Sequence, residues 1–167
     1  MTAKPETARP RPTAPMGPND IRVFCDAAAA FFEQTTGATA AVRTAYLMPA
    51  AEPAVWNDFQ GLIELSGRYR GSVAFSASRG LLSHVLLKIG EGDYSDASHR
   101  DIVGEIANQM SGYARRHFGE TLDISVPRVL SAAERSGVGA SGVQPFVIPM
   151  RWDGYEAHLV VRIAKAA

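Results

Sequence analysis

Two segments of this 167-residue sequence have the pattern of a β-hairpin, and they restrict the folds that the chain can adopt. In residues 61–78, apolar residues alternate with polar or small ones on both sides of the turn sequence SGRYRG. A second alternating pair, in residues 145–164, turns at Asp153 and Gly154. Because a hairpin pairs its strands antiparallel, a doubly wound parallel sheet is disfavoured.

Three further segments carry apolar residues at helical spacing, three or four positions apart. We expect the first helix to begin at an Asn19 N-cap. Two stretches rich in β-branched residues indicate additional strands. The order of these elements predicts an α+β fold in two layers, with a mainly antiparallel sheet of about six strands packed against three helices. The helical segments are 19–37, 79–92 and 96–118, and the additional strands are 38–48 and 123–133.

The composition is that of a globular protein without a dominant charge. Hydrophobic residues make up 46% of the chain and charged residues 20%, and 17 basic residues balance 17 acidic ones. This balance disfavours nucleic acid and anionic membranes as partners. No apolar run approaches the roughly 18 residues of a membrane span, and the single cysteine, Cys25, suits a reducing cytoplasm, where we expect the protein to act. We expect residues 1–18 to be a flexible, proline-rich tail and residues 19–167 to form one domain.

Common catalytic and metal-binding motifs are missing from the sequence. Four scattered histidines and one cysteine form no Cys-x-x-Cys or His-x-x-x-His pair, so we expect no bound metal. The chain also has no Gly-x-x-x-x-Gly-Lys-Ser/Thr phosphate loop and no Gly-x-Ser-x-Gly nucleophile elbow. Covalent catalysis therefore has no support in the sequence.

The long third helical segment has a distinctive polar face. At 100° per residue, Glu105 lies at the centre of the polar arc, with Asp101 one turn earlier and Asn108 three residues later. Gly112, seven residues after Glu105, contributes no side chain to this face. The helix thus presents a carboxylate and a carboxamide beside a bare patch, which would let another surface approach them. Taken alone, a Glu-x-x-Asn pair is also what an ordinary solvated helix face contains.

The segment DIVGEIANQMSGYA, residues 101–114, resembles the signature helix of the CheX-type chemotaxis phosphatases, relatives of CheC and FliY. The motif of that family has a small or acidic residue, a Glu, an Asn three residues later and a Gly four residues after that. It is matched by Asp101, Glu105, Asn108 and Gly112. The hairpin sequence LIELSGRYRGSVAFS and the strand sequences DISVPRVL and FVIPM are also similar to the family, so the likeness covers about residues 19–163.

The resemblance implies that the protein hydrolyses the phosphoryl group on the aspartate of a CheY-like response regulator. Asn108 would orient the attacking water, and Glu105 would pair with the lysine of the receiver site. The partner would dock on Asp101, Gly112 and Arg115. Mg²⁺ is expected in the partner's receiver site, and no cofactor is expected in this chain.

The resemblance also bears on the number of sites and on assembly. CheC-like members carry two such helices, but the first helical segment here has no Glu-x-x-Asn, so one site per chain is expected, as in CheX. CheX-type members pair through their sheets. Because Pro127 and Pro149 fall in expected strands, where a missing N–H implies an edge or a bulge, a homodimer is expected.

Two other functions fit the same residues. A non-catalytic adaptor would bind a receiver or a flagellar partner through the same helix without hydrolysing anything. A structural component of the flagellar switch is the third alternative. An intact Glu105 and Asn108 favour the phosphatase, but these two residues alone do not distinguish turnover from binding.

Overall fold

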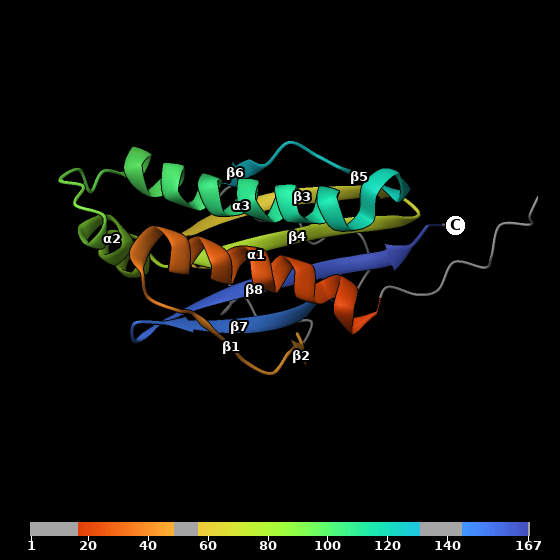
Figure 1. The fold of residues 1–167 in the computed structure, drawn as a ribbon, viewed down its shortest axis with the longest axis horizontal. Helices are drawn as coiled ribbons and strands as arrows, with labels where there is room; N and C mark the ends of the chain where they lie inside the picture. Colours follow the sequence, from red (N-terminus) through yellow and green to blue (C-terminus); the bar gives the residue numbers. More distant parts are fainter. Residues whose placement is uncertain (1–16, 49–56, 131–144, 167) are drawn as a thin grey trace, which may run out of the picture.

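The computed structural model describes residues 17–48, 57–130 and 145–166, which are coloured in Figure 1. The described residues form three helices, eight strands and one turn of 3-10 helix, η1 (Gly119–Thr121). The predicted tail lies almost wholly outside the described residues. The helices are α1 (Pro18–Thr36), α2 (Arg79–Lys88) and α3 (Asp96–Phe118). The strands are β1 (Ala41–Val42), β2 (Tyr46–Leu47), β3 (Phe59–Gly67), β4 (Tyr69–Ala77), β5 (Leu122–Ile124), β6 (Arg128–Leu130), β7 (Phe146–Trp152) and β8 (Tyr155–Lys165).

The strands form one antiparallel sheet in the order β1-β7-β8-β4-β3-β5, with β2 paired to β7 and β6 paired to β3. The two predicted hairpins, β3–β4 and β7–β8, are joined at the centre of the sheet by the pairing of β4 with β8. The second hairpin turns where predicted, with positive φ angles at Asp153 (45°) and Gly154 (81°). The α+β, two-layer prediction is therefore confirmed, with eight strands in place of about six.

Helices α1 and α3 run antiparallel across one face of the sheet, and α2 lies beside them at one end (Figure 1). The main core fills the space between this helical layer and the sheet, and it includes side chains with no solvent exposure from both layers, such as Phe24, Phe32, Phe75, Val103, Ile106 and Leu159. A second buried cluster contains residues whose side chains alternate with those of the main core, namely Met48, Leu62, Ala74, Leu130, Val147 and Val160. Both faces of the sheet thus carry buried apolar side chains.

Two predicted strands are each divided in the structure. The expected strand 38–48 is present only as β1 and β2, and the expected strand 123–133 is present as β5 and β6 with Pro127 between them. The reason for the first division lies opposite, in β7. Pro149 lacks an N–H, and its carbonyl accepts from the backbone N–H of Arg43 at 2.8 Å, so its missing donor faces the interruption between β1 and β2.

The N-cap of helix α1 lies two residues before the predicted one. Gly17 is the N-cap residue and Pro18 is the first helical residue, a position where proline loses nothing by lacking an N–H. The carboxylate of Asp20 accepts from the backbone N–H of Gly17 at 3.0 Å, so the acidic residue stabilises the helix start and Asn19 does not cap it. The helix ends at Gly37, in the left-handed conformation with φ 75°.

Candidate functional site

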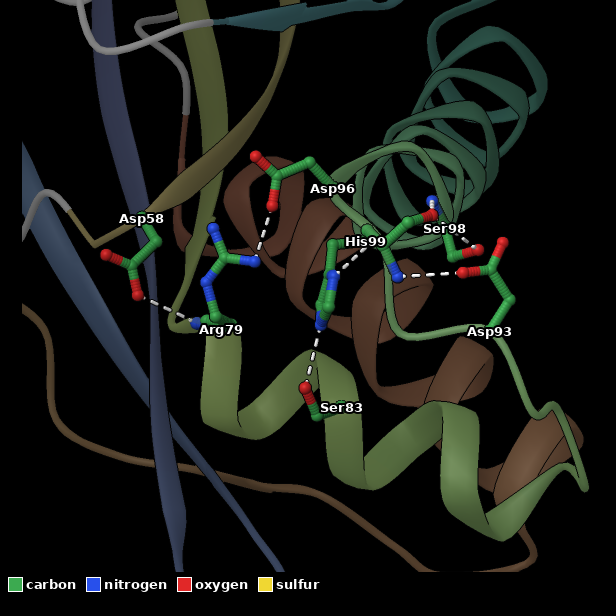
Figure 2. Close-up of polar contacts among 8 residues, drawn as sticks. Asp58, Arg79, Ser83, Asp93, Asp96, Ser98 and His99 are labelled. Carbon is green, nitrogen blue, oxygen red and sulfur yellow. Dashed lines mark hydrogen bonds and ion pairs between the residues drawn. The ribbon is translucent and has the colours of Figure 1, made fainter.

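The candidate site lies on α3, and the N-terminus of this helix is fixed by a polar cluster (Figure 2). Ser95 is the N-cap, and its hydroxyl accepts from the backbone N–H of Ser98 at 3.3 Å. The backbone N–H of Ser95 in turn donates to Asp93 at 2.9 Å, and this bond holds the pKa of the Asp93 carboxyl below its ordinary value. The cap therefore sets where α3 begins.

His99 connects this end of α3 to α2, although it is completely buried. Its Nδ1 lies 2.6 Å from the carbonyl oxygen of Ser95, to which it donates. Its Nε2 lies 2.7 Å from the hydroxyl of Ser83 on α2, within hydrogen-bond distance (Figure 2). The ring also stacks on Phe59 of β3, with centroids 5.4 Å apart. One side chain thus holds α3 to a neighbouring helix and to the sheet.

Arg79 at the start of α2 makes a second connection to α3. Its guanidinium forms an ion pair with Asp96 (Figure 2). The same group lies 5.2 Å from the centroid of the Phe59 ring. The hydrogen bond from Arg79 lowers the pKa of the Asp96 carboxyl. The backbone N–H of Arg79 donates to Asp58 at 2.8 Å, so the same residue also anchors the start of α2.

The far end of α3 is tied to α1. His117 Nε2 lies 2.9 Å from an Asp20 carboxylate oxygen near the start of α1, and this hydrogen bond lowers the pKa of Asp20. Further back along α3, the side-chain amide of Gln109 donates to that of Gln34 on α1 at 3.1 Å. With both ends held and its apolar face buried, α3 presents its polar face in a fixed orientation.

The structure places the predicted catalytic pair on that polar face. Glu105 and Asn108 are both exposed, on a helix that is continuous from Asp96 to Phe118. Neither side chain forms a hydrogen bond or ion pair with another residue of the described ranges 17–48, 57–130 and 145–166. A carboxylate and a carboxamide without internal partners are available to bind another molecule.

Glu105 and Asn108 share a shallow depression of about 440 Å³ where α1 and α3 come together. Its wall also includes Gly112, as the sequence predicted, and Gln34, which comes from α1. Asp101 is exposed one turn before Glu105 and does not line the depression. The complete lining is Gln34, Glu105, Asn108, Gln109, Gly112, Tyr113 and Arg116.

The two arginines near the end of α3 lie differently. Arg115 donates from Nη2 to the carbonyl oxygen of Ile124 at 3.1 Å, and it is absent from the depression. Arg116 lines the depression instead, with its guanidinium 4.7 Å from the centroid of the Tyr113 ring. The helical spacing could have identified Arg116, because at 100° per residue it lies about 20° from Glu105 and Arg115 lies about 80° away. No local sequence signal indicates Gln34, which reaches the site only through the packing of α1 on α3.

The described residues that line the depression include no serine, threonine, cysteine or histidine. The free cysteine, Cys25, lies on α1 within the core, and burial raises its pKa to about 11. Among the described residues, no group of three or more His, Cys, Asp or Glu side chains could hold a metal ion. Within these residues no helix is both long and apolar enough to cross a membrane. The side chains of the depression can orient, hydrogen-bond and pair with charges.

The fold and the site together define a class of α+β proteins that present a carboxylate and a carboxamide from one long helix. The model of the CheX family, described as chemotaxis phosphatase CheX, matches residues 59–151, which include the β3–β4 hairpin, α2 and all of α3. The chain belongs to this family of chemotaxis phosphatases.

Solved structures with low sequence identity share the fold. A CheC-like superfamily protein from Shewanella sp. PV-4 has a TM-score of 0.74 at 21% identity, with 89% of this chain and 99% of that chain covered. CheX from Vibrio vulnificus has a TM-score of 0.72 at 20% identity, covering 87% and 99%. The CheX–CheY–BeF₃–Mg²⁺ complex from Borrelia burgdorferi matches with a TM-score of 0.64 at 18% identity, covering 87% of this chain and 97% of that one. The comparison with curated proteins gives no match.

Proposed function

We propose that this protein removes the phosphoryl group from the aspartate of a CheY-like response regulator. The observation that carries the proposal is the exposed pair Glu105 and Asn108. The two side chains share one depression and form no hydrogen bonds or ion pairs with other described residues. Membership of a phosphatase family gives the reaction class. The Borrelia complex, in which a CheX is bound to CheY, indicates the class of partner.

Asn108 is the residue we assign to the attacking water. Phosphoryl transfer depends on positioning and charge stabilisation more than on covalent chemistry, and a neutral carboxamide can hold a water in line with the phosphorus atom. The amide accepts one hydrogen bond from the water through its oxygen and leaves the nucleophile otherwise free. Asn108 suits this role because it is exposed on a continuous helix and its side chain forms no hydrogen bond with any other residue that the structure describes.

Glu105 is the residue we assign to anchoring. A lysine in the receiver site would form an ion pair with its carboxylate, which lies one turn before Asn108 on the same helix face. The pair sets the register in which the carboxamide enters the receiver, and it discriminates against partners without that cation. Asp101 extends the acidic end of this face, and Gly112 leaves room for the receiver surface.

The magnesium ion of the reaction belongs to the receiver. The Borrelia complex contains Mg²⁺ together with CheY and BeF₃. The charge of the transferred phosphoryl group would therefore be neutralised from the partner's side. The residues of the depression would contribute hydrogen bonding and one ion pair, which matches their chemistry.

The proposal is tested by phosphorylating response regulators of the same organism with a small phosphodonor and following phosphate release with and without the protein. Asn108→Ala should slow the catalysed reaction about 100-fold while the KM for the receiver changes little, because a water-orienting contact matters mainly in the transition state. Glu105→Ala should weaken receiver binding by roughly 2–5 kcal/mol, because it leaves the receiver lysine unpaired.

Glu120→Ala serves as the matched control, since Glu120 is exposed in η1 beyond the end of α3 and outside the depression. It should behave as the wild type does. If the wild type and Asn108→Ala give equal phosphate release and both still bind the receiver, the phosphatase proposal is wrong and the adaptor function takes its place.

A further inference from the structure

We propose that Arg116 determines which receivers this protein accepts, by binding a carboxylate on the receiver surface at a point separate from the phosphorylation site. The inference rests on the proposed function and adds the second charge of the docking surface. Its first support is position. Arg116 lies three turns after Glu105 on the same face of α3, and both side chains line the depression.

The guanidinium of Arg116 is held at the surface by contacts within its own helix. It lies 4.7 Å from the centroid of the Tyr113 ring, which is within the range of a cation–π contact. Its Nη1 lies 3.8 Å from the position that a Cβ atom on Gly112 would take. The side chain therefore folds back along α3 over the glycine, so it loses less conformational freedom when a partner binds.

The positive charge of Arg116 is not neutralised within the described part of the chain. Two exposed arginines form ion pairs, Arg79 with Asp96 and Arg128 with Glu64. Among residues 17–48, 57–130 and 145–166, Arg116 has no carboxylate within ion-pair distance. Its neighbours in the depression at this end, Gln109, Gly112 and Tyr113, carry no charge at neutral pH.

Arg116 lies farther along the helix than the proposed reacting residue. It follows Asn108 by eight residues, about 12 Å along the helix axis, and its guanidinium folds back to the level of Gly112, four residues or about 6 Å beyond Asn108. A receiver that docks with its phosphorylation site over Asn108 therefore brings a neighbouring part of its surface to Arg116. An acidic side chain on that surface has the required chemistry, and the kcat measurement below distinguishes it from the phosphoryl group.

Glu105 and Arg116 together give the docking surface a direction. Their backbone positions are about 16 Å apart along the axis of α3, with the negative residue nearer its N-terminus and the positive residue nearer its C-terminus. A matching receiver carries a cation and an anion in the opposite order, and a receiver with the wrong charge at the second point is rejected even when its phosphorylation site is intact.

The test uses the full-length protein and the receiver that it dephosphorylates. Phosphate release is measured over a range of receiver concentrations for the wild type, Arg116→Glu, Arg115→Glu and Arg100→Glu. Arg100 is the matched control, because it lies on α3 outside the depression and donates to the Val129 carbonyl. We expect Arg116→Glu to raise KM at least about tenfold, with kcat within twofold of the wild type, and the control to leave both unchanged.

A binding titration makes the result independent of turnover. The receiver is activated with BeF₃ in place of the phosphoryl group, and its affinity for each variant is measured at low and high salt. Arg116→Glu should weaken binding about tenfold at low salt and less at high salt. One receiver variant in which a surface carboxylate is replaced by lysine should restore the affinity of Arg116→Glu while weakening that of the wild type. Circular dichroism shows that each variant is folded.

The outcomes separate the two proposals. If the wild type binds the activated receiver but does not accelerate phosphate release, the proposed phosphatase activity is wrong. The binding titration still decides the role of Arg116 in that case. An unchanged affinity and KM for Arg116→Glu overturns the inference and leaves the phosphatase in place. A fall in kcat alone also overturns it, because Arg116 would then act on the phosphoryl group. A larger effect of Arg115→Glu would place the second contact on the other side of α3.

Discussion

Gly61 of β3 lies directly beneath Val103 of α3. A Cβ atom at position 61 would come within 2.7 Å of the Val103 carbonyl oxygen and 2.9 Å of the Ala107 Cβ. Real Cβ atoms essentially never show such a separation from backbone, so the absence of a side chain here is what lets α3 rest closely on the sheet. The helix that carries Glu105 and Asn108 therefore has its height above the sheet set by one glycine.

Replacing Gly61 with alanine should destabilise the fold and disturb the site. Because the atom in the way is backbone, α3 must shift outward, and overpacking of this kind costs roughly 1–3 kcal/mol. Urea unfolding followed by circular dichroism measures the effect. Gly104→Ala is the control, since its Cβ would meet only Val129 Cγ2 at 3.5 Å, an ordinary contact. Alanine in a helix interior should leave the stability unchanged or raise it by up to about 1 kcal/mol. Equal behaviour of the two variants would show that Gly61 does not set the height of α3.

Gly104 lies beside the polar arc of α3, but a Cβ atom there would make only one ordinary contact, so close packing of the helix does not depend on it. The glycine that close packing requires is Gly61, in the strand β3 that packs against α3. A residue's own element can be recognised from its periodicity, but which residue faces it across the core depends on how the layers are stacked.

The ion pair between Arg79 and Asp96 predicts how stability changes in acid. The Arg79 hydrogen bond lowers the pKa of Asp96 from its ordinary value of 3.8 in the folded state. A lowered carboxyl pKa contributes stability that is present above pH 3.8 and is lost as the pH falls through the folded value. Asp96→Asn should therefore reduce stability at pH 7 and flatten its decline below about pH 4. Thermal unfolding across pH 2–7 provides the measurement.

The control for this prediction is Arg79→Gln. In that background Asp96→Asn should have little further effect on the pH profile, because the cause of the lowered pKa has been removed. If the two substitutions change the acid profile independently, the ion pair is not what couples α2 to the start of α3.

The sequence could predict those features of the site that depend on residues within α3 alone. The bounds of α3, the exposure of Glu105 and Asn108, and the turn at Asp153-Gly154 all depend on spacing within one segment, and the structure agrees with each. The contribution of Gln34 depends on α1 lying beside α3, so no window of sequence contains it. Arg116 was within reach of the same helical geometry that selected Glu105.

The divided strands were unpredictable for a related reason. The stretch 38–48 contains β-branched and aromatic residues, but strand pairing depends on the partner strand, and Pro149 in β7 offers no N–H at the point where β1 ends. The Gly17 cap was missed because Asn19 is the stronger local signal, and only the Asp20 hydrogen bond to Gly17 moves the helix start. In both cases a residue outside the local pattern, Pro149 for the strand and Asp20 for the helix cap, decided the structure.

We expect the protein to form a homodimer, through the edge of the sheet that β1 and β2 provide. This edge exposes Val42, Tyr46 and Leu47 to 46%, 42% and 64%, an unusual concentration of large apolar side chains beside a short outer strand pair. Light scattering at high micromolar concentration should give twice the monomer mass, and Leu47→Lys should shift the equilibrium toward the monomer.

The control position is Val126, which is 77% exposed between β5 and β6 at the opposite edge of the sheet. Val126→Lys should leave the mass unchanged. A monomeric mass for the wild type would contradict the expectation.

Gly112 provides the sharpest separation of stability from function. The nearest atom to a Cβ built at this position is Arg116 Nη1 at 3.8 Å, so the structure of the chain itself does not require glycine there. Gly112→Leu should therefore raise the stability of the fold by up to about 1 kcal/mol, because leucine is the better helix former. The same side chain would occupy the depression between Asn108 and Arg116 and keep the receiver away. The affinity for an activated receiver should therefore fall at least about tenfold, a loss of roughly 1.4 kcal/mol or more.

The control is Gly112→Ala, which should share the gain in stability and lose much less affinity. Unfolding curves and binding titrations on the same preparations measure both quantities, and a Gly112→Leu variant that binds as tightly as the wild type would mean that the receiver does not approach this face of α3.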